Sequence, residues 1–248
     1  MDQKAFSAAL GQVPADLVIT NGQIVNVFTG EIYPGGVAVS GDRIIAQGDV
    51  AYAIGTGTEI IDAEGQFIVP GFVEGHIHPE SANLSLTSFA DVVLAHGTTT
   101  VFTDLHEIGV VGGADAMDAA LAEGRATPLT FKFVFPSHVP FSPGLETSGG
   151  MIDANVIEQA LARDDVVGIG EVVSQYVAFG LPDLLRSIEA TRQAGKVLSG
   201  HGPETHGPMW NAFASLGIAN DHEALSLDDV LVRVRNGVYA HLRHNLLV

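Results

Sequence analysis

Strand-like and helix-like segments alternate from residue 69 to the end of the chain, and this alternation limits the fold more than any other feature of the sequence. Short apolar runs such as TTTVFTD, LTFKFVFP and VVGIGEVV are typical of buried strands, and the segments between them have the apolar spacing of amphipathic helices. Such an alternation predicts a parallel sheet covered by helices. We count seven strands, each ending in a polar or ionisable residue, as at the C-terminal mouth of a (β/α)8 barrel.

An open doubly wound sheet is the alternative architecture, but no glycine-rich phosphate-binding fingerprint follows the first strand. We therefore predict an α/β fold, a (β/α)8 or TIM-like barrel, over residues 69–248. A complete barrel takes about 250 residues, and about 180 follow residue 68. The barrel is thus expected to be incomplete, with strands one to about seven. Either the fold is unusual or the chain is a fragment of a longer protein.

Residues 1–68 have a different pattern, because from Asp16 to Val69 the sequence reads as short strands joined by tight turns. Asn21-Gly22 predicts a hairpin turn between DLVIT and IVNVF, because both positions tolerate positive φ. Gly41-Asp42 and Glu64-Gly65 mark two further turns. The partial alternation of apolar and polar residues predicts a small N-terminal β subdomain with one buried face.

Charge and composition exclude several classes of partner. The chain carries 29 acidic against 11 basic residues, a formal net charge of −18, so we expect neither nucleic acid nor an anionic membrane as a partner. The apolar runs are too short to span a membrane, and the N-terminus lacks the pattern of a secretory signal. The absence of cysteine excludes disulfides, thiolate metal sites and a cysteine nucleophile, and it fits a cytoplasmic protein.

The residues at the ends of the predicted strands have the chemistry of a metal site. The stretch FIVPGFVEGHIHPE reads as a buried strand that runs into His76 and His78, whose side chains point the same way in an extended chain. Later strands end in or near Glu171, His201 and His222. A single histidine is more often structural than a ligand, but four histidines and a carboxylate at one end of successive strands favour metal binding. Imidazole and carboxylate ligands suit Zn, Fe, Mn or Co, and one glutamate could bridge two ions.

These motifs resemble those of a known family. The stretch PGFVEGHIHPES is similar to the signature of the adenine deaminases, in the amidohydrolase superfamily. The resemblance continues, in the same order and over nearly the whole chain, through ADLVITNGQIVNVFTGEIY, HGTTTVFTDLHEI, PSHVP with LETSGG, GIGEV, GHGPETHG and ANDHE. HxH alone is moderately specific, whereas its combination with the other motifs is strong.

The resemblance implies a metal-dependent barrel that converts adenine to hypoxanthine and ammonia through a metal-activated water. It places metal ligands at His76, His78, Glu171, His201 and His222, with Glu171 where many relatives have a carbamylated lysine. The implied cofactors are two divalent ions, Mn or Fe ahead of Zn. The implied partner is a small-molecule purine, and oligomers are common among relatives. Residues 1–68 would form half of a composite, sandwich-like domain that also uses segments from the other end of the full chain.

Several residues next to the predicted ligands are assigned other roles. His106 and Glu107, in the DLHEI segment, are candidates for proton transfer or further metal binding, with a loop-anchoring pair as the equal alternative. Asp104 is expected to orient the loop that follows it, and Asp221 to be structural. No interface between subunits is specified by the sequence.

Two other functions stay open. The first is another reaction of the same superfamily, as in a cyclic amidohydrolase or an N-acetyl sugar deacetylase. The second is a truncated, non-catalytic chain that binds metal. It is motivated by the missing eighth strand, after which the family carries an aspartate that binds metal and takes a proton from the attacking water. An incomplete barrel also exposes unpaired strand edges, which favour association.

Overall fold

The computed structural model describes residues 2–142 and 144–243. The chain divides into two compact units, residues 1–70 and 71–248. The first unit contains a short helix and five strands: α1 (Gln3–Ala9), β1 (Leu17–Val25), β2 (Ile32–Ser40), β3 (Arg43–Gly48), β4 (Glu59–Asp62) and β5 (Phe67–Ile68), with a 3-10 turn, η1, at Ala51–Ala53. The strands form one sheet in the order β3-β2-β1-β4, and β5 also pairs with β1.

The Asn21-Gly22 prediction is wrong, because these residues lie inside β1 and not at a hairpin turn. The register of β1 against β2 shifts between Ile19 and Gly22, where Asn21 has a φ of 54°, so the pair forms a bulge. The turn between β1 and β2 lies at residues 26–31, where Asn26 Oδ1 accepts a hydrogen bond of 3.0 Å from the backbone N–H of Phe28. The predicted two-residue turn at Gly41-Asp42 is confirmed, since Ser40 pairs with Arg43.

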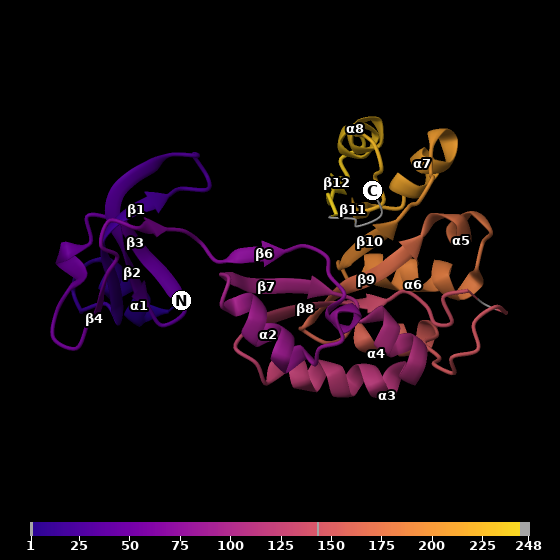
Figure 1. Ribbon diagram of the computed structural model, residues 1–248, viewed down its shortest axis with the longest axis horizontal. Helices are drawn as coiled ribbons and strands as arrows, with labels where there is room; N and C mark the ends of the chain where they lie inside the picture. The colour runs from indigo at the N-terminus through magenta and orange to yellow at the C-terminus, as the bar shows by residue number, and fades with distance from the viewer. Residues whose placement is uncertain (1, 143, 244–248) are drawn as a thin grey trace. The chain divides into compact units, whose positions relative to one another are not determined.

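The second unit is a seven-stranded sheet in which every neighbouring pair of strands is parallel (Figure 1). The order is β12-β11-β10-β9-β8-β7-β6, so each strand pairs with the strand before it in the chain. The strands are β6 (Phe72–Glu74), β7 (Thr98–Thr103), β8 (Thr130–Pro136), β9 (Val166–Val173), β10 (Val197–His201), β11 (Ile218–Asp221) and β12 (Tyr239–Ala240). Among the described residues no strand joins β6 to β12, and the predicted incomplete barrel is confirmed.

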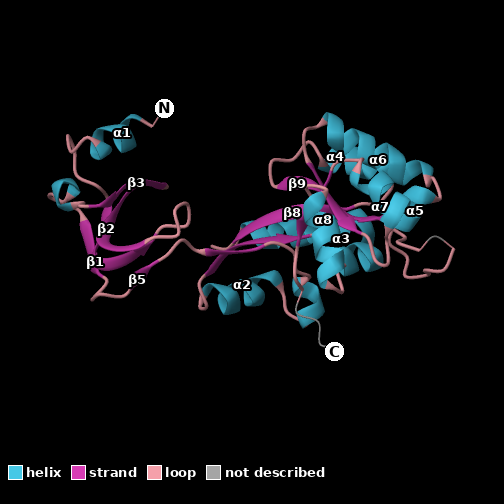
Figure 2. Ribbon diagram, turned by 90° about the horizontal axis from the view of Figure 1, so that it is seen from above, coloured by secondary structure: helices cyan, strands magenta, loops and turns pink. Residues whose placement is uncertain are grey.

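Helices follow most of these strands, as the alternation predicts (Figure 2). Ser85 caps the first of them by accepting a hydrogen bond of 3.1 Å from Ser88 N, and α2 and α3 pack against β7 and β8. The elements are η2 (Pro79–Ala82), α2 (Leu86–Leu94), α3 (His106–Arg125), α4 (Ala154–Ala160), α5 (Ser174–Ala178), α6 (Pro182–Gln193), α7 (Gly207–Ala214) and α8 (Leu227–Arg235). Within the described residues, no helix combines the length and the apolar character needed to cross a membrane.

Two further features of the structure differ from the sequence-based expectation. Phe67–Ile68 pairs with β1 of the first unit, and His76 and His78 lie just beyond β6, so FIVPGFVEGHIHPE is not a single strand. The helix expected near residues 114–123 begins at His106, because the chain continues helically on both sides of a kink at Gly113. His106 and Glu107 therefore occupy the first turn of a helix and not a loop.

The core of the second unit is one apolar cluster between the sheet and its helices. Its largest fully buried side chains include Trp210, Phe133, Phe135, Phe213 and Leu121. Burial of side chains of this size contributes about 1.5–3 kcal/mol each relative to exposure. Because neighbouring strands are parallel, their C-terminal ends lie at the same edge of the sheet.

Candidate metal centre

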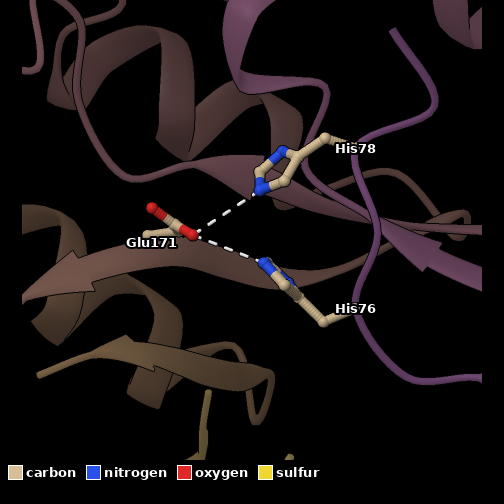
Figure 3. A group of neighbouring side chains, drawn as sticks. All are labelled: His76, His78 and Glu171. Carbon is tan, nitrogen blue, oxygen red and sulfur yellow. Dashed lines mark ion pairs between the residues drawn. The ribbon is translucent and has the colours of Figure 1, made fainter. Parts of the chain in front are cut away.

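Five polar side chains meet at the C-terminal edge of the parallel sheet. His76 and His78 follow β6, Glu171 lies in β9, His201 ends β10, and His222 follows β11. Figure 3 shows the two imidazoles of the first loop directed at the carboxylate of Glu171. These are the five residues that the sequence predicts as ligands, and the structure brings all of them together.

Glu171 is the centre of the cluster. Its Oε1 lies 3.3 Å from His76 Nε2, 3.7 Å from His78 Nε2 and 2.9 Å from His222 Nε2. Its Oε2 lies 3.0 Å from His201 Nδ1. Oε1 thus faces three of the imidazoles and Oε2 faces the fourth, so both carboxylate oxygens are directed at potential metal-binding nitrogens.

The donor atoms have spacings that suit metal coordination. His76, His78 and Glu171 form one group, and Glu171, His201 and His222 form another, each with donor atoms within 4.8 Å of one another. Donors about 2.1 Å from an ion in a tetrahedral site lie roughly 3.4 Å apart. His76 Nε2 is buried and has no hydrogen-bond partner among the described residues, although a carboxylate oxygen is 3.3 Å away. A metal ion would satisfy this nitrogen, so the cluster fits divalent cations bound by nitrogen and oxygen.

Without a metal ion, the cluster favours charged side chains. Burial lowers the pKa of His78, but the carboxylates of Asp104 and Glu171 outweigh burial and raise it to about 11. Burial likewise opposes protonation of His222, whereas Glu171 and Glu223 raise its pKa to about 9. The surrounding imidazoles hold the pKa of Glu171 far below its usual range despite burial. Metal ions bind the neutral imidazole, so metal binding must release protons from His78 and His222.

A second group of carboxylates lies on the other side of the His78 ring. Asp104 Oδ1 is 2.9 Å from His78 Nδ1, Glu107 Oε2 is 3.5 Å from it and Glu80 Oε1 is 4.0 Å from it. Burial and the neighbouring Glu107 raise the pKa of Glu80 to about 8. A carboxylate behind a metal-binding histidine fixes the ring orientation and makes the ring a stronger ligand. Asp104 therefore orients His78 in addition to accepting a hydrogen bond from the backbone N–H of His106.

The two residues predicted for proton transfer lie beside the cluster and not within it. Glu107 is half-exposed and accepts a hydrogen bond of 2.8 Å from Ser81 Oγ. His106 lies edge-on to Phe141 with ring centroids 4.4 Å apart, and Phe141 in turn faces His201. Both ring nitrogens of His106 are buried without a hydrogen-bond partner among the described residues.

Sequence reasoning missed two members of the site. Asp104, which is predicted from its place after the strand to orient the following residues, also lies behind His78. Glu223 directly follows His222, and its Oε1 lies 3.2 Å from His222 Nε2. Asp221, expected to be structural, accepts hydrogen bonds from Arg233 and from the backbone N–H of Gly202.

A cavity of about 590 Å³ opens beside the histidines. This volume is within the range of small-molecule sites. Its lining includes both charged and apolar side chains: Glu74, His76, Ile77, His78, Ser81, His222, His241, Leu242 and Arg243. The cluster is therefore accessible to a small ligand.

Replacement of Asp104 by asparagine is expected to weaken metal binding about 10–100-fold. The variant keeps the size of the buried side chain but removes the charge behind His78 Nδ1, so the ring becomes a poorer ligand. Competition with a chromophoric chelator measures the affinity. Asp91→Asn, at an exposed position on α2, is the control and should bind metal as the wild type does. Equal affinities for Asp104→Asn and the wild type would contradict the orienting role.

The sequence is similar to several adenine deaminases. It is 41% identical over 245 residues to adenine deaminase 3 of Rhizobium meliloti (strain 1021), and 40% identical over 239 residues to the adenine deaminase of Dehalococcoides mccartyi. These alignments cover 97% and 96% of this chain, and 41% of each relative. The chain thus spans about two fifths of the length of these curated relatives. No protein-family model matches the sequence.

The fold is similar to that of solved amidohydrolases. A crystal structure of an adenine deaminase superposes with a TM-score of 0.61 at 18% sequence identity, over 91% of this chain and 65% of that one. The structural likeness supports the incomplete TIM-like barrel, and the sequence relatives described above are adenine deaminases. The chain is therefore similar in sequence to adenine deaminases over nearly its whole length, and it corresponds to about two fifths of theirs.

Proposed function

We propose that the chain carries the metal site of an adenine deaminase, which hydrolyses the C6–amino bond of adenine to give hypoxanthine and ammonia. The observation that supports this most is the Glu171 cluster, in which one carboxylate faces four histidines. The identity of about 40% to adenine deaminases supports the choice of substrate.

The proposed cofactors are two divalent ions, Mn or Fe ahead of Zn. His76 and His78 would hold one ion, His201 and His222 the other, and Glu171 would bridge them. Bound there, divalent ions would lower the pKa of a water molecule and polarise the purine ring. The nitrogen and oxygen donors, without thiolate, suit all three metals.

The chain's own residues would position the substrate and move protons. The reaction needs a proton at N1 of the purine and another on the leaving amine. Glu107 is the candidate nearer to the ligands, because its carboxylate lies 3.5 Å from His78 Nδ1. His106 is the second candidate, since both of its ring nitrogens are without a partner among the described residues. The helix α3 holds both residues in its first turn.

The remaining proposals concern the setting of the protein. A small purine is the proposed partner, whereas the net charge of −18 disfavours nucleic acid and anionic membranes. A cytoplasmic location, a homo-oligomeric state and the composite, sandwich-like domain that includes residues 1–68 stay predictions from the sequence.

The function is tested by turnover assays on metal-free protein reloaded with Mn²⁺, Fe²⁺ or Zn²⁺. Hypoxanthine and ammonia are expected from adenine, with no turnover of dihydroorotate or of N-acetylglucosamine phosphate. Conversion of either of the last two in place of adenine would favour another amidohydrolase reaction. Metal binding without any turnover would favour the non-catalytic alternative, which is motivated by the lack of a strand between β6 and β12 among the described residues.

A further inference from the structure

Glu223 lies at the metal cluster although neither the sequence motifs nor the ligand groups described above assign it a role. It follows β11 and His222, and its side chain is 11% exposed. Its Oε1 lies 3.2 Å from His222 Nε2 and 3.7 Å from His201 Nδ1. These two nitrogens are 3.2 Å apart and are the ones that face Glu171. The three donor atoms therefore form a compact triangle of two nitrogens and one oxygen.

The side of the ring that Glu223 contacts distinguishes a ligand from an orienting residue. An orienting carboxylate contacts the imidazole nitrogen that faces away from the metal, as Asp104 does at His78 Nδ1. The corresponding atom of His222 is Nδ1, which is buried and has no hydrogen-bond partner among the described residues. Glu223 instead contacts Nε2, the nitrogen that points into the cluster. Its carboxylate is therefore on the side where an ion would sit.

The position of Glu223 is fixed by two contacts. Its backbone N–H donates a hydrogen bond of 3.1 Å to Asp221 Oδ1, and Asp221 is itself held by the buried Arg233. Arg243 Nη1 donates a hydrogen bond to Glu223 Oε1 from the cavity side. A carboxylate has about four lone-pair sites, so one that accepts from a guanidinium can also bind an ion.

We propose that Glu223 is an additional carboxylate ligand of the ion held by His201 and His222, and that Arg243 positions it. This inference rests on the proposed metal site. Two divalent ions carry four positive charges, and Glu171 supplies a single negative charge among the five predicted ligands. Glu223 adds a second negative charge on the side of His201 and His222. That ion then has two nitrogen and two oxygen ligands from the protein, a set that suits Zn, Fe or Mn.

The test is a Co²⁺ titration of the metal-free 248-residue chain, followed by calorimetry and by visible absorption. Wild type is expected to bind two equivalents. Glu223→Gln keeps the side-chain shape but removes the charge, and it is expected to weaken one of the two binding events by at least about 10-fold and to change the Co²⁺ absorption bands. Arg243→Gln leaves the carboxylate in place and should give a smaller loss at the same event. Glu59→Gln, on the exposed strand β4, should match the wild type.

The outcomes separate this inference from the proposed function. Two unchanged binding events and an unchanged Co²⁺ spectrum in Glu223→Gln would overturn the ligand role and leave the two-ion site standing. Wild-type affinity in Arg243→Gln, together with a loss in Glu223→Gln, would overturn the positioning role alone. A wild type that binds no Co²⁺ would overturn both the inference and the proposed function. Circular dichroism of each variant shows that a loss of binding is not a loss of fold.

Discussion

Replacement of Glu171 by glutamine is expected to remove metal from the site and to abolish the proposed hydrolysis. Glu171 is the only one of the five predicted ligands that faces all the others, at distances from 2.9 to 3.7 Å. Glutamine has nearly the same shape, but it is neutral and directs an amide N–H₂ group at atoms that should face a cation. Loss of a residue that orients a ligand typically weakens metal binding about 10–100-fold. Replacement of Glu171 should weaken it more.

Elemental analysis of the purified variant measures this effect directly. Wild type should hold about two metal ions per chain, and Glu171→Gln less than one. Glu158→Gln is a matched control, since Glu158 is a glutamate that pairs with Arg186 on the helices α4 and α6. Its metal content should equal that of the wild type. A Glu171→Gln protein that retains two ions would show that Glu171 is not a bridging ligand.

The largest expected effect on stability comes from Arg233. This side chain is 1% exposed, and its guanidinium contacts the Asp221 carboxylate, which is fully buried. It also donates a hydrogen bond of 3.0 Å to the carbonyl of Gly202 and lies 4.5 Å over the centroid of the Trp210 ring. Replacement by methionine leaves Asp221 buried without its partner, which typically costs about 3–5 kcal/mol.

Urea unfolding of a small set of variants distinguishes this charge effect from a packing effect. Arg233→Met should lower the free energy of unfolding by about 3–5 kcal/mol. The double variant Arg233→Met, Asp221→Asn should recover part of the loss, because the unpaired buried charge is gone. A change below about 1 kcal/mol in Arg233→Met, or an additive loss in the double variant, would contradict the account.

The side chains of the proposed metal site could be predicted because each one follows a local signal. An apolar strand that ends in a histidine or glutamate is visible within a few residues, and the carboxyl ends of parallel strands meet at one edge of the sheet. His76, His78, Glu171, His201 and His222 were therefore placed together from the sequence alone. The seven strands follow from the same local signal, whereas the incomplete barrel follows from the number of residues left after residue 68.

The features that were missed depend on contacts between distant segments. Asn21-Gly22 suits a hairpin turn by itself, and the pairing of β1 with β2 decides that it forms a bulge. The sequence predicts a later start for α3 than the structure shows, since GVVGG, residues 109–113, contains three glycines, which disfavour helix. Asp104 and Glu223 gain their roles from the side chains that tertiary folding brings next to them.

The order of the second sheet has a consequence for protein synthesis. Since each of its strands pairs with the strand before it, the sheet can grow one strand at a time as the chain leaves the ribosome. The cluster would then form in chain order. Glu171 would first lie beside His76 and His78. His201 and His222 would join them later. During that interval the nascent chain would hold only the donor group of His76, His78 and Glu171, and the group of Glu171, His201 and His222 would be complete only after β11 has docked.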